Sequence, residues 1–377
     1  MERYTLSVPT LFGLEGLCAE ELRRMDLEQV RAENGRVLCE CGPAGIVRAN
    51  LNLRTGERVL IRLGRFDAPD FDALYQGVRA LPWEEFVPRD GVFPVKGHSL
   101  DSRLHSVPRC TAVIRAAVAD RLGGKYGLEH LPETGAVCQV QFLLMKDTAE
   151  LYLDTSGPSL HKRGYRAVGV AAPLRETLAA GMVMISRYRG KEPFRDPFCG
   201  SGTIPIEAAL IAKNRAPGLD RTFSAQKWAW LPSSVWMEEA DRAMDLEYDG
   251  NYDIMGSDID ARAVDIARAN AEKAGVEDLV RFAQADAAAF HPGGEAGRVV
   301  TNPPYGERLS DRKEAEELYA DFGQAWKAMP SGWSLYLLSS HTEFERTFGR
   351  TADKKRKLYN GMLKCDLFQY LGKRGKT

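Results

Sequence analysis

Residues 302–305, Asn-Pro-Pro-Tyr, combine groups that could hold a planar amino group for chemistry. They directly follow residues 299–301, Val-Val-Thr, a β-branched run that predicts the end of a buried strand. Two consecutive prolines can neither continue a sheet ladder nor enter a helix interior. We therefore expect a rigid extended turn just past the carboxyl end of the strand, which is where ligands bind in an open α/β sheet.

The acceptors of this turn suit an exocyclic amine on a nucleobase. The side-chain oxygen of Asn302 and the carbonyl of Pro303 can both accept hydrogen bonds from one NH2 group, and the ring of Tyr305 can stack on the attached heterocycle. Holding both hydrogens out of the ring plane localises the nitrogen lone pair toward an electrophile. No strong general base is needed, because the proton becomes acidic once the nitrogen is alkylated. A purely structural turn is the alternative, and the upstream motifs decide between the two.

Upstream, residues 196–203 read Asp-Pro-Phe-Cys-Gly-Ser-Gly-Thr between a predicted strand and a predicted helix. Gly200 and Gly202 let the backbone approach a ligand at a helix N-terminus. The loop lacks the third glycine of a dinucleotide fingerprint and the Gly-Lys-Thr of a phosphate loop, which favours a cofactor without a pyrophosphate. Asp196 could accept from the amine of an amino-acid moiety, directly or through water.

The next two predicted strands also end in acidic residues. Asp258 suits ribose hydroxyls, whereas Asp260 suits the N-cap of the following helix. Asp286 could accept from an adenine amine. Each alone could be a cap or a turn residue. Three at successive strand ends, together with the glycine loop and the Pro-Pro turn, describe a pocket for adenosine joined to an amino acid, and S-adenosylmethionine fits it.

The elements around these motifs predict an α/β domain over residues 157–377. Strands at 194–196, 252–257, 280–284, 298–301 and 333–339 alternate with helices at 173–189, 204–212, 261–274 and 313–329. This alternation indicates a mainly parallel sheet between helix layers. Residues 354–358 and 364–370 flank Asn360-Gly361, which predicts an antiparallel hairpin at the carboxyl end.

The front of the chain predicts two smaller modules. Strands at 4–8, 30–33, 36–40 and 58–66 and helices at 14–25 and 44–51 follow the ferredoxin-like order, so a first domain is expected over residues 1–66. Helices at 70–80 and 106–122 and strands at 92–97, 136–144 and 148–154 predict a second α+β domain over residues 67–156.

Composition sets further bounds on this chain of 377 residues. Its net charge of −1 excludes a generic polyanion binder, so contacts with nucleic acid must come from local basic surface. No apolar run is long enough to span a membrane, and no signal pattern opens the chain. Seven scattered cysteines, without a CxxC pair, indicate neither a disulfide framework nor a metal site. A cytoplasmic protein is expected, and the oligomeric state is left open.

Taken together, these motifs resemble the THUMP-domain class I S-adenosylmethionine-dependent RNA methyltransferases, a resemblance that covers essentially the whole chain. Besides the cofactor motifs, four segments carry this resemblance: residues 161–166, which read His-Lys-Arg-Gly-Tyr-Arg, residues 172–180, Phe223 with Lys227-Trp228, and residues 302–309. The closest group is similar to the large-subunit ribosomal RNA guanine-N2 methyltransferases, and a sister group methylates the same atom in transfer RNA. Some members carry a second fused methyltransferase; because the chain ends after one, we expect no second activity.

The resemblance implies roles for individual residues. It implies a Rossmann-like methyltransferase domain in which Asn302, Pro303 and Tyr305 act on the guanine amine. It also implies cofactor contacts at Leu174, Thr177, Asp196, Cys199, Gly200, Gly202, Thr203, Asp258, Ile259, Asp286 and Ala287, and RNA contacts at Lys162, Arg163, Tyr165, Arg166 and Arg308. For the basic residues, an ordinary solvated surface is the equal alternative.

Two other functions remain as alternatives. A DNA adenine-N6 methyltransferase shares the Asn-Pro-Pro-Tyr motif, but the front half looks like an RNA-binding module. A non-catalytic RNA-binding or ribosome-assembly protein would not need intact Asp196, Asp258, Asp286 and Asn302. The sequence therefore predicts an enzyme that binds S-adenosylmethionine and RNA, ribosomal RNA first and transfer RNA second, with no metal and no membrane partner.

Overall fold

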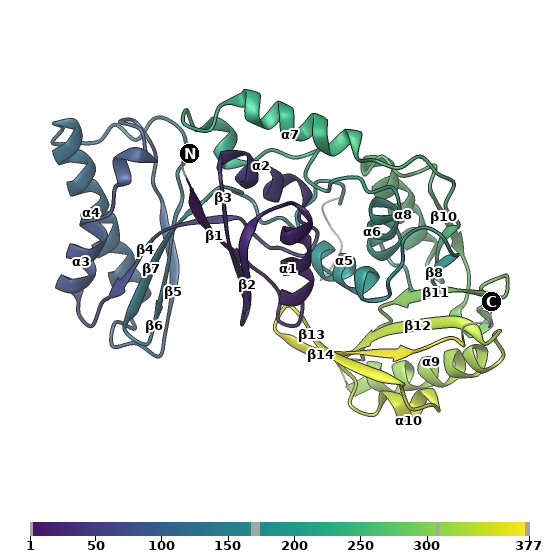
Figure 1. The fold of residues 1–377 in the computed structure, drawn as a ribbon. Coiled ribbons are helices and arrows are strands. Elements are labelled where there is room, and N and C mark those ends of the chain that lie inside the picture. Colours follow the sequence, from purple (N-terminus) through teal and green to yellow (C-terminus); the bar gives the residue numbers. More distant parts are fainter. Residues whose placement is uncertain (1–2, 167–173, 307–308, 374–377) are drawn as a thin grey trace. The chain divides into compact units, whose positions relative to one another are not determined.

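The computed structural model describes residues 3–166, 174–306 and 309–373. The chain forms two compact units. The first comprises Met1–Thr10, Ala19–Leu160 and Arg221–Arg242, and the second comprises Leu11–Cys18, His161–Asp220 and Ala243–Thr377. The chain therefore passes between the units several times, as the colours of Figure 1 allow the reader to follow.

The first unit is built on one seven-stranded sheet. Its strands are β1 (Tyr4–Pro9), β2 (Glu28–Glu33), β3 (Arg36–Cys41), β4 (Leu60–Asp67), β5 (Val95–Leu100), β6 (Val140–Met145) and β7 (Thr148–Asp154). Their spatial order is β2-β3-β1-β4-β7-β6-β5. The strands expected for two separate modules thus join through the antiparallel pair β4–β7.

The helices of this unit follow the expected order. They are α1 (Glu15–Arg24, of which residues 19–24 belong here), α2 (Pro43–Asn52), α3 (Phe71–Arg79), η1 (Trp83–Glu85) and α4 (Val107–Tyr126), with η2 (Ser224–Lys227) and most of α7 (Ser233–Asp245) contributed from later in the chain. The ferredoxin-like and α+β fold predictions are confirmed. Helix α7 was not anticipated.

Several boundaries in this unit differ from expectation, among them the strand expected at 136–144, which begins at Val140. Two of the differences have local reasons. The strand expected at 92–97 begins at Val95, because Pro94 cannot donate to a ladder; Val92 forms only an isolated bridge. Helix α4 continues through Gly123 and Gly124 to Tyr126 and ends at Gly127, whose φ of 65° is the left-handed conformation typical of a helix end.

The second unit holds another seven-stranded sheet. Its strands are β8 (Phe194–Asp196), β9 (Ile254–Asp258), β10 (Val280–Gln284), β11 (Ala296–Thr301), β12 (Gly332–Ser339), β13 (Lys354–Asn360) and β14 (Leu363–Tyr370), in the order β10-β9-β8-β11-β12-β14-β13. β8 to β12 are parallel, and the terminal hairpin joins antiparallel. The predicted Rossmann-like domain with an antiparallel hairpin is confirmed.

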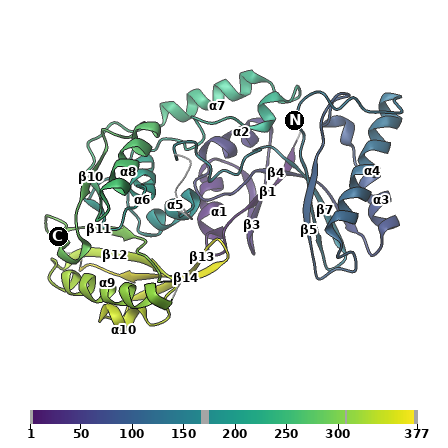
Figure 2. The same ribbon diagram turned by 180° about the vertical axis from the view of Figure 1, so that it is seen from behind.

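Helices cover both faces of this sheet. They are α5 (Glu176–Ile185), α6 (Thr203–Ala212), α8 (Ala261–Lys273), η3 (Ala287–Ala289), α9 (Leu309–Lys327) and α10 (Phe344–Phe348). α6 and α8 lie on one side of the strands and α9 and α10 on the other, in both views of Figures 1 and 2. The strand order reverses between β8 and β11, and this switch point is where an open α/β sheet binds ligands.

Within the described ranges, every helix is too short or too polar to cross a membrane. All seven cysteines are buried, and none forms a disulfide; Cys39 and Cys41 pack in β3 as ordinary strand residues.

Candidate active site

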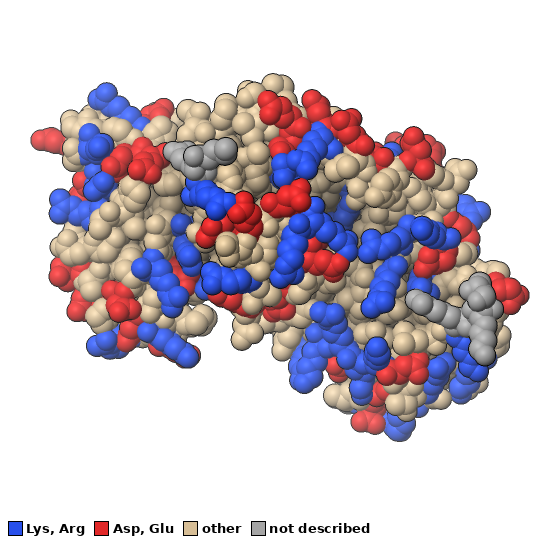
Figure 3. Space-filling view, viewed as in Figure 1, with Lys and Arg blue, Asp and Glu red and all other residues tan. Residues whose placement is uncertain are grey.

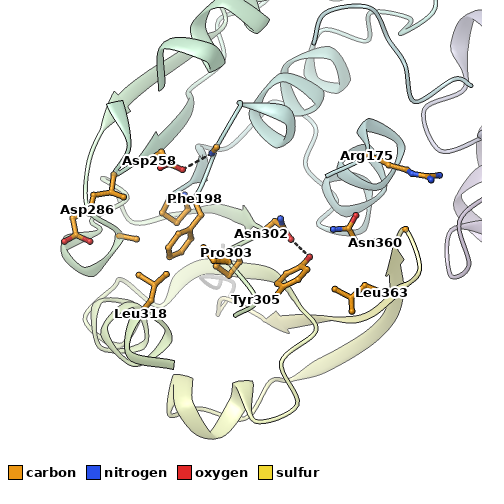
Figure 4. A pocket seen from close by; sticks show the side chains of 16 residues that line it. Arg175, Phe198, Asp258, Asp286, Asn302, Pro303, Tyr305, Leu318, Asn360 and Leu363 are labelled. Carbon is orange, nitrogen blue, oxygen red and sulfur yellow. Dashed lines mark hydrogen bonds between the residues drawn. The ribbon is translucent and has the colours of Figure 1, made fainter. Parts of the chain in front are cut away.

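A cavity of about 610 Å³ lies at the carboxyl ends of β8, β9, β10 and β11. Its lining includes Gly200, Asp258, Ile259, Asp286, Ala287, Asn302, Pro303 and Tyr305, all expected at a cofactor or substrate site. We call Gly200, Asp258 and Asp286 the acid wall, and Asn302, Pro303 and Tyr305 the amide wall. Figure 4 shows the two walls in one cavity, with Phe198 and Leu318 between them.

Asp258 organises the glycine loop. One carboxylate oxygen accepts from the backbone amide of Gly200 at 2.9 Å, and the other accepts from the amide of Asp260 at 3.0 Å. Gly200 has a φ of 49°, and a Cβ there would meet nothing within 4 Å, so its open side is available for a ligand. Asp260 itself caps α8 by accepting from the amide of Arg262, as predicted.

Gly202 has a different role from Gly200. It is the N-cap of α6 with a φ of 81°, and a Cβ there would lie 2.9 Å from the Cβ of Ala267 and 3.0 Å from the Phe282 ring. Gly202 is therefore required by packing between α6, α8 and β10. Gly202 does not line the cavity, and its expected contact with a cofactor stays a prediction.

The far end of the acid wall combines a carboxylate with apolar side chains. Asp286 begins η3 and accepts from the amide of Ala288 at 2.9 Å. Ile259 follows β9 and is 66% exposed, although it is a large aliphatic residue, and Ala287 closes the floor. A flat heterocycle could pack on the exposed isoleucine while its amino group donates a hydrogen bond to the carboxylate.

Asp196 lies beneath the cavity at the end of β8. One carboxylate oxygen accepts from the Thr301 hydroxyl at 2.6 Å and from the Phe198 amide at 3.2 Å. The other oxygen, Oδ2, is buried and has no partner among the described residues. Burial raises the pKa of Asp196 to about 7. Because this buried carboxylate oxygen has no donor among the described residues, it can accept a hydrogen bond from a ligand, directly or through water.

The amide wall is held rigidly by its own side chains. The Tyr305 hydroxyl donates to the side-chain oxygen of Asn302, and the Tyr319 hydroxyl donates to the carbonyl of Pro304. Burial raises the pKa of Tyr305, so its hydroxyl stays a donor. An amide oxygen has two lone pairs, so Asn302 can accept a second hydrogen bond.

Four other expected cofactor residues lie behind the cavity. Leu174, Thr177, Cys199 and Thr203 are all buried, and none is part of the described lining. Burial raises the pKa of the Cys199 thiol, so the side chain stays a neutral thiol. Cys199 therefore packs in the loop as a small apolar residue. Their expected contacts with a cofactor stay predictions.

The basic residues near 161–166 require a correction. Arg163 and Tyr165 are 4% exposed, and both point at Glu207 of α6, with contacts of 3.4 and 3.1 Å. Arg166 donates to the Leu174 carbonyl and to the Thr203 hydroxyl. Arg163 and Tyr165 therefore cannot face RNA, because their polar groups serve a buried carboxylate.

Of the two other expected RNA contacts, Lys162 is exposed, whereas Arg308 lies outside the described residues.

Several lining residues were missed by sequence reasoning. Arg175, Phe198 and Leu318 line the cavity, and Asn360 and Leu363 reach it from the turn of the β13–β14 hairpin. The Asn360-Gly361 pair predicts the hairpin itself. It does not predict where the hairpin lies, because that position depends on the pairing of β14 with β12. A second cavity of about 710 Å³ shares Tyr305, Asn360 and Leu363 with the first and opens toward Arg312 and Met362.

The fold and this site define a class I methyltransferase. Family models match three parts of the chain: an RlmL ferredoxin-like domain at residues 5–60, a THUMP domain at 68–154, and an RMKL-like methyltransferase domain at 163–369. The chain therefore belongs to the RMKL-like family of S-adenosylmethionine-dependent RNA methyltransferases, and the family resemblance drawn from the sequence is confirmed.

Similar proteins align with almost the whole length of this chain. It is 43% identical to a putative RNA methyltransferase, YpsC, from Bacillus subtilis, across 99% of this chain and 97% of that protein. It is 35% identical to the ribosomal RNA large subunit methyltransferase K/L of Psychromonas ingrahamii across 96% of this chain, but it spans only 49% of that relative. The chain thus spans about half the length of the K/L relatives.

Solved structures agree with the fold. SMU.472, a putative methyltransferase complexed with SAH, matches with a TM-score of 0.94 and 40% identity over 100% of both chains. A protein from Listeria monocytogenes described as a predicted N6-adenine-specific DNA methylase matches with a TM-score of 0.94 and 45% identity, over 99% of this chain and 97% of that one.

Proposed function

We propose that this protein transfers a methyl group from S-adenosylmethionine to the exocyclic N2 amine of a guanine in large-subunit ribosomal RNA. The observation that carries the proposal is the amide wall, Asn302, Pro303 and Tyr305, in the same cavity as the acid wall. Amine acceptors and a nucleoside-binding edge therefore meet within one cavity. The ribosomal substrate is supported by the K/L relatives and by the THUMP match.

The acid wall fits S-adenosylmethionine. The cavity is of the size that small-molecule sites have. Asp258 would accept from the ribose hydroxyls, Asp286 from the adenine amine, and Ile259 would pack on the adenine ring. The unpartnered Oδ2 of Asp196 would accept from the ammonium group, directly or through water. The bound cofactor supplies an electrophilic methyl group on its sulfonium.

The amide wall would orient the attacking nitrogen. Asn302 offers one lone pair beyond its bond to Tyr305, and the Pro303 carbonyl has no donor among the described residues. Both can accept from one NH2 group, while the Tyr305 ring stacks on the base. The carbonyl of Pro304 is already engaged by Tyr319, which leaves Pro303 as the second acceptor. Positioning of this kind supplies much of a rate enhancement without a general base.

The target guanine must leave its helix to reach the turn. The second cavity, which shares Tyr305 and Asn360 with the first and is also lined by Arg312, would receive the base on its way in. RNA would be held by the first unit. The division into functional parts at residues 1–66, 67–156 and 157–377 remains a prediction; the three family models fall inside these limits.

The test is methylation with isotope-labelled S-adenosylmethionine, using ribosomal RNA, transfer RNA and DNA from a strain lacking the protein, followed by nucleoside mass spectrometry. N2-methylguanosine in the large-subunit RNA is expected. N2-methylguanosine in transfer RNA alone would move the assignment to that RNA. N6-methyladenine in DNA would overturn it in favour of the activity that the Listeria relative's description states.

A further inference from the structure

The sheet of the first unit has a face with an arginine-lined hollow. The hollow, of about 500 Å³, is lined by Thr5, Arg31, Glu33, Arg36, Leu38, Arg62, Leu63, Gly64 and Arg65 from β1 to β4. Helices α2 and α3 pack on the opposite face, where Gly45 meets Cys41 and Gly77 meets Phe66. Figure 3 shows Lys and Arg over the strands of this unit, with Asp and Glu among them.

A β-bulge brings two of the arginines to the same face. Arg62 pairs with Tyr152 and Arg65 pairs with Glu150, and the register shifts between Arg62 and Gly64. Residues three apart on a regular strand point to opposite faces. The extra residue at the bulge reverses that relation, so both guanidinium groups line the hollow.

Arg36 is fixed in place by three acceptors, of which Glu150 and Tyr152 are buried. Its guanidinium donates to Glu150 at 2.8 Å, to the Tyr152 hydroxyl at 2.7 Å and to Glu33 at 2.8 Å. Although burial opposes the effect, hydrogen bonds from Arg36 and Tyr152 lower the pKa of Glu150, which keeps this carboxylate ionised. Arg36 therefore forms a rigid floor.

The hollow retains excess positive charge. Four guanidinium groups face two carboxylates, Glu33 and Glu150, which both contact Arg36; Arg65 lies 3.8 Å from Glu150. Among the described residues, neither Arg31 nor Arg62 makes an ion pair. Two uncompensated guanidinium groups over a concave surface suit the fork geometry of phosphate oxygens.

Further basic side chains lie on the same face at β5. Across β7 and β6, Gln141 lies opposite Tyr152, and on β5 Lys96 lies opposite Gln141 and His98 opposite Leu143. Lys96 and His98 are exposed. This face therefore holds exposed basic side chains at β5 as well as at the hollow, separated by Gln141 and Tyr152.

From this geometry we infer that the hollow binds backbone phosphates of the RNA substrate through Arg31 and Arg62, above a floor fixed by Arg36. The inference rests on the proposed function, because it assigns an RNA-holding site to that enzyme. It replaces the RNA contacts first expected at Arg163 and Tyr165, which are buried. The proposed ligand is a phosphodiester of the RNA backbone. Free phosphate has the same kind of oxygen acceptors and would bind the same arginines.

The test compares the full-length protein with Arg31→Gln/Arg62→Gln in filter binding to transcribed large-subunit ribosomal RNA across a salt series. Each lost phosphate contact should reduce the slope of log K against log salt by about 1. Two lost contacts should weaken binding by roughly 10- to 60-fold near 0.1 M salt. The matched control is Arg24→Gln, an exposed arginine on α1 paired with Glu20, which should bind as wild type.

Outcomes separate the inference from the proposed function. If wild type methylates RNA and the double variant binds RNA with unchanged affinity and slope, the phosphate site is refuted while the function stands. If the variant loses binding but wild type methylates no RNA, the site stands and the function falls. Tight binding of inorganic phosphate with unchanged RNA affinity would make the hollow a small-anion site and overturn the RNA assignment. Arg31→Lys/Arg62→Lys should restore part of the affinity, and unchanged thermal unfolding excludes misfolding.

Discussion

The two walls of the cavity use their polar groups differently. On the acid wall, Asp258 and Asp286 already accept hydrogen bonds from backbone amides, and so they shape the loops as well as line the cavity. On the amide wall, the side chain of Asn302 accepts a hydrogen bond from another side chain, the Tyr305 hydroxyl, and not from a backbone amide of the described residues. Loss of an acid-wall residue should therefore change cofactor binding, whereas loss of an amide-wall residue should change the chemical step.

The largest expected effect is on the amide wall. Asn302→Ala should lower kcat by roughly 100- to 1,000-fold, because the amine loses an acceptor that orients it in the transition state. The affinity for S-adenosylmethionine, measured by calorimetry, should not change. Asn302→Asp, which keeps the acceptor oxygen, serves as the comparison. Wild-type turnover in the alanine variant would remove this residue from the mechanism.

The next effect falls on the acid wall. Asp258→Ala should weaken S-adenosylmethionine binding by roughly 10- to 100-fold, since both the proposed ribose acceptor and the anchor of Gly200 are lost. Asp260→Ala, only two residues away, is the matched control: it should cost about 1 kcal/mol of stability as a lost helix cap. Equal calorimetric affinities for the two variants would contradict the distinction between them.

A pH effect should follow from Asp196, whose pKa burial raises to about 7. An ionised Asp196 accepts from the cofactor ammonium, so affinity should fall by up to about tenfold per pH unit as the pH drops below that value. Calorimetry from about pH 5.5 to 8.5 measures the profile. Asp196→Asn should flatten it. An identical profile in that variant would assign the titration to another group.

The smallest effect should come from Tyr305→Phe. The ring remains for stacking, and only the hydroxyl contact with Asn302 is lost. We expect kcat to fall by about 3- to 10-fold, the usual value of one hydrogen bond. Tyr305→Ala, which also removes the ring, should be far more damaging and should raise KM for RNA. If kcat fell equally in both variants, Tyr305 would contribute through its hydroxyl and not through stacking of its ring.

Local signals predicted much of the fold and part of the site. β8 and β10 occupy the expected residues, and in β10 the buried Val280 and Phe282 alternate with the exposed Arg281, the period-2 pattern of a strand. Asp260 caps α8 as expected, since a cap depends on atoms within a few residues. The hairpin at Asn360-Gly361 also forms as expected. Its reach into the cavity depends on strand pairing across the sheet, and no local signal carries that information.

The basic segment near Arg163 shows why local reasoning failed there. Its charge run looked like a surface for RNA, but Glu207, 44 residues later on α6, lies buried against it. A buried carboxylate needs a partner, and Arg163 and Tyr165 supply it. In β4, by contrast, a bulge turns Arg62 and Arg65 to the same face, although their spacing in the sequence predicts opposite faces.

By itself, the sequence determined the class of enzyme, since Asn-Pro-Pro-Tyr after one strand and carboxylates after three others state which chemical groups are present and in what order. Only the tertiary structure decided which of these groups share a cavity, which glycine lines it, and which arginines line the hollow of the first sheet. The physical reason is distance along the chain: motif chemistry depends on neighbouring atoms, whereas exposure and charge compensation depend on residues brought together by folding.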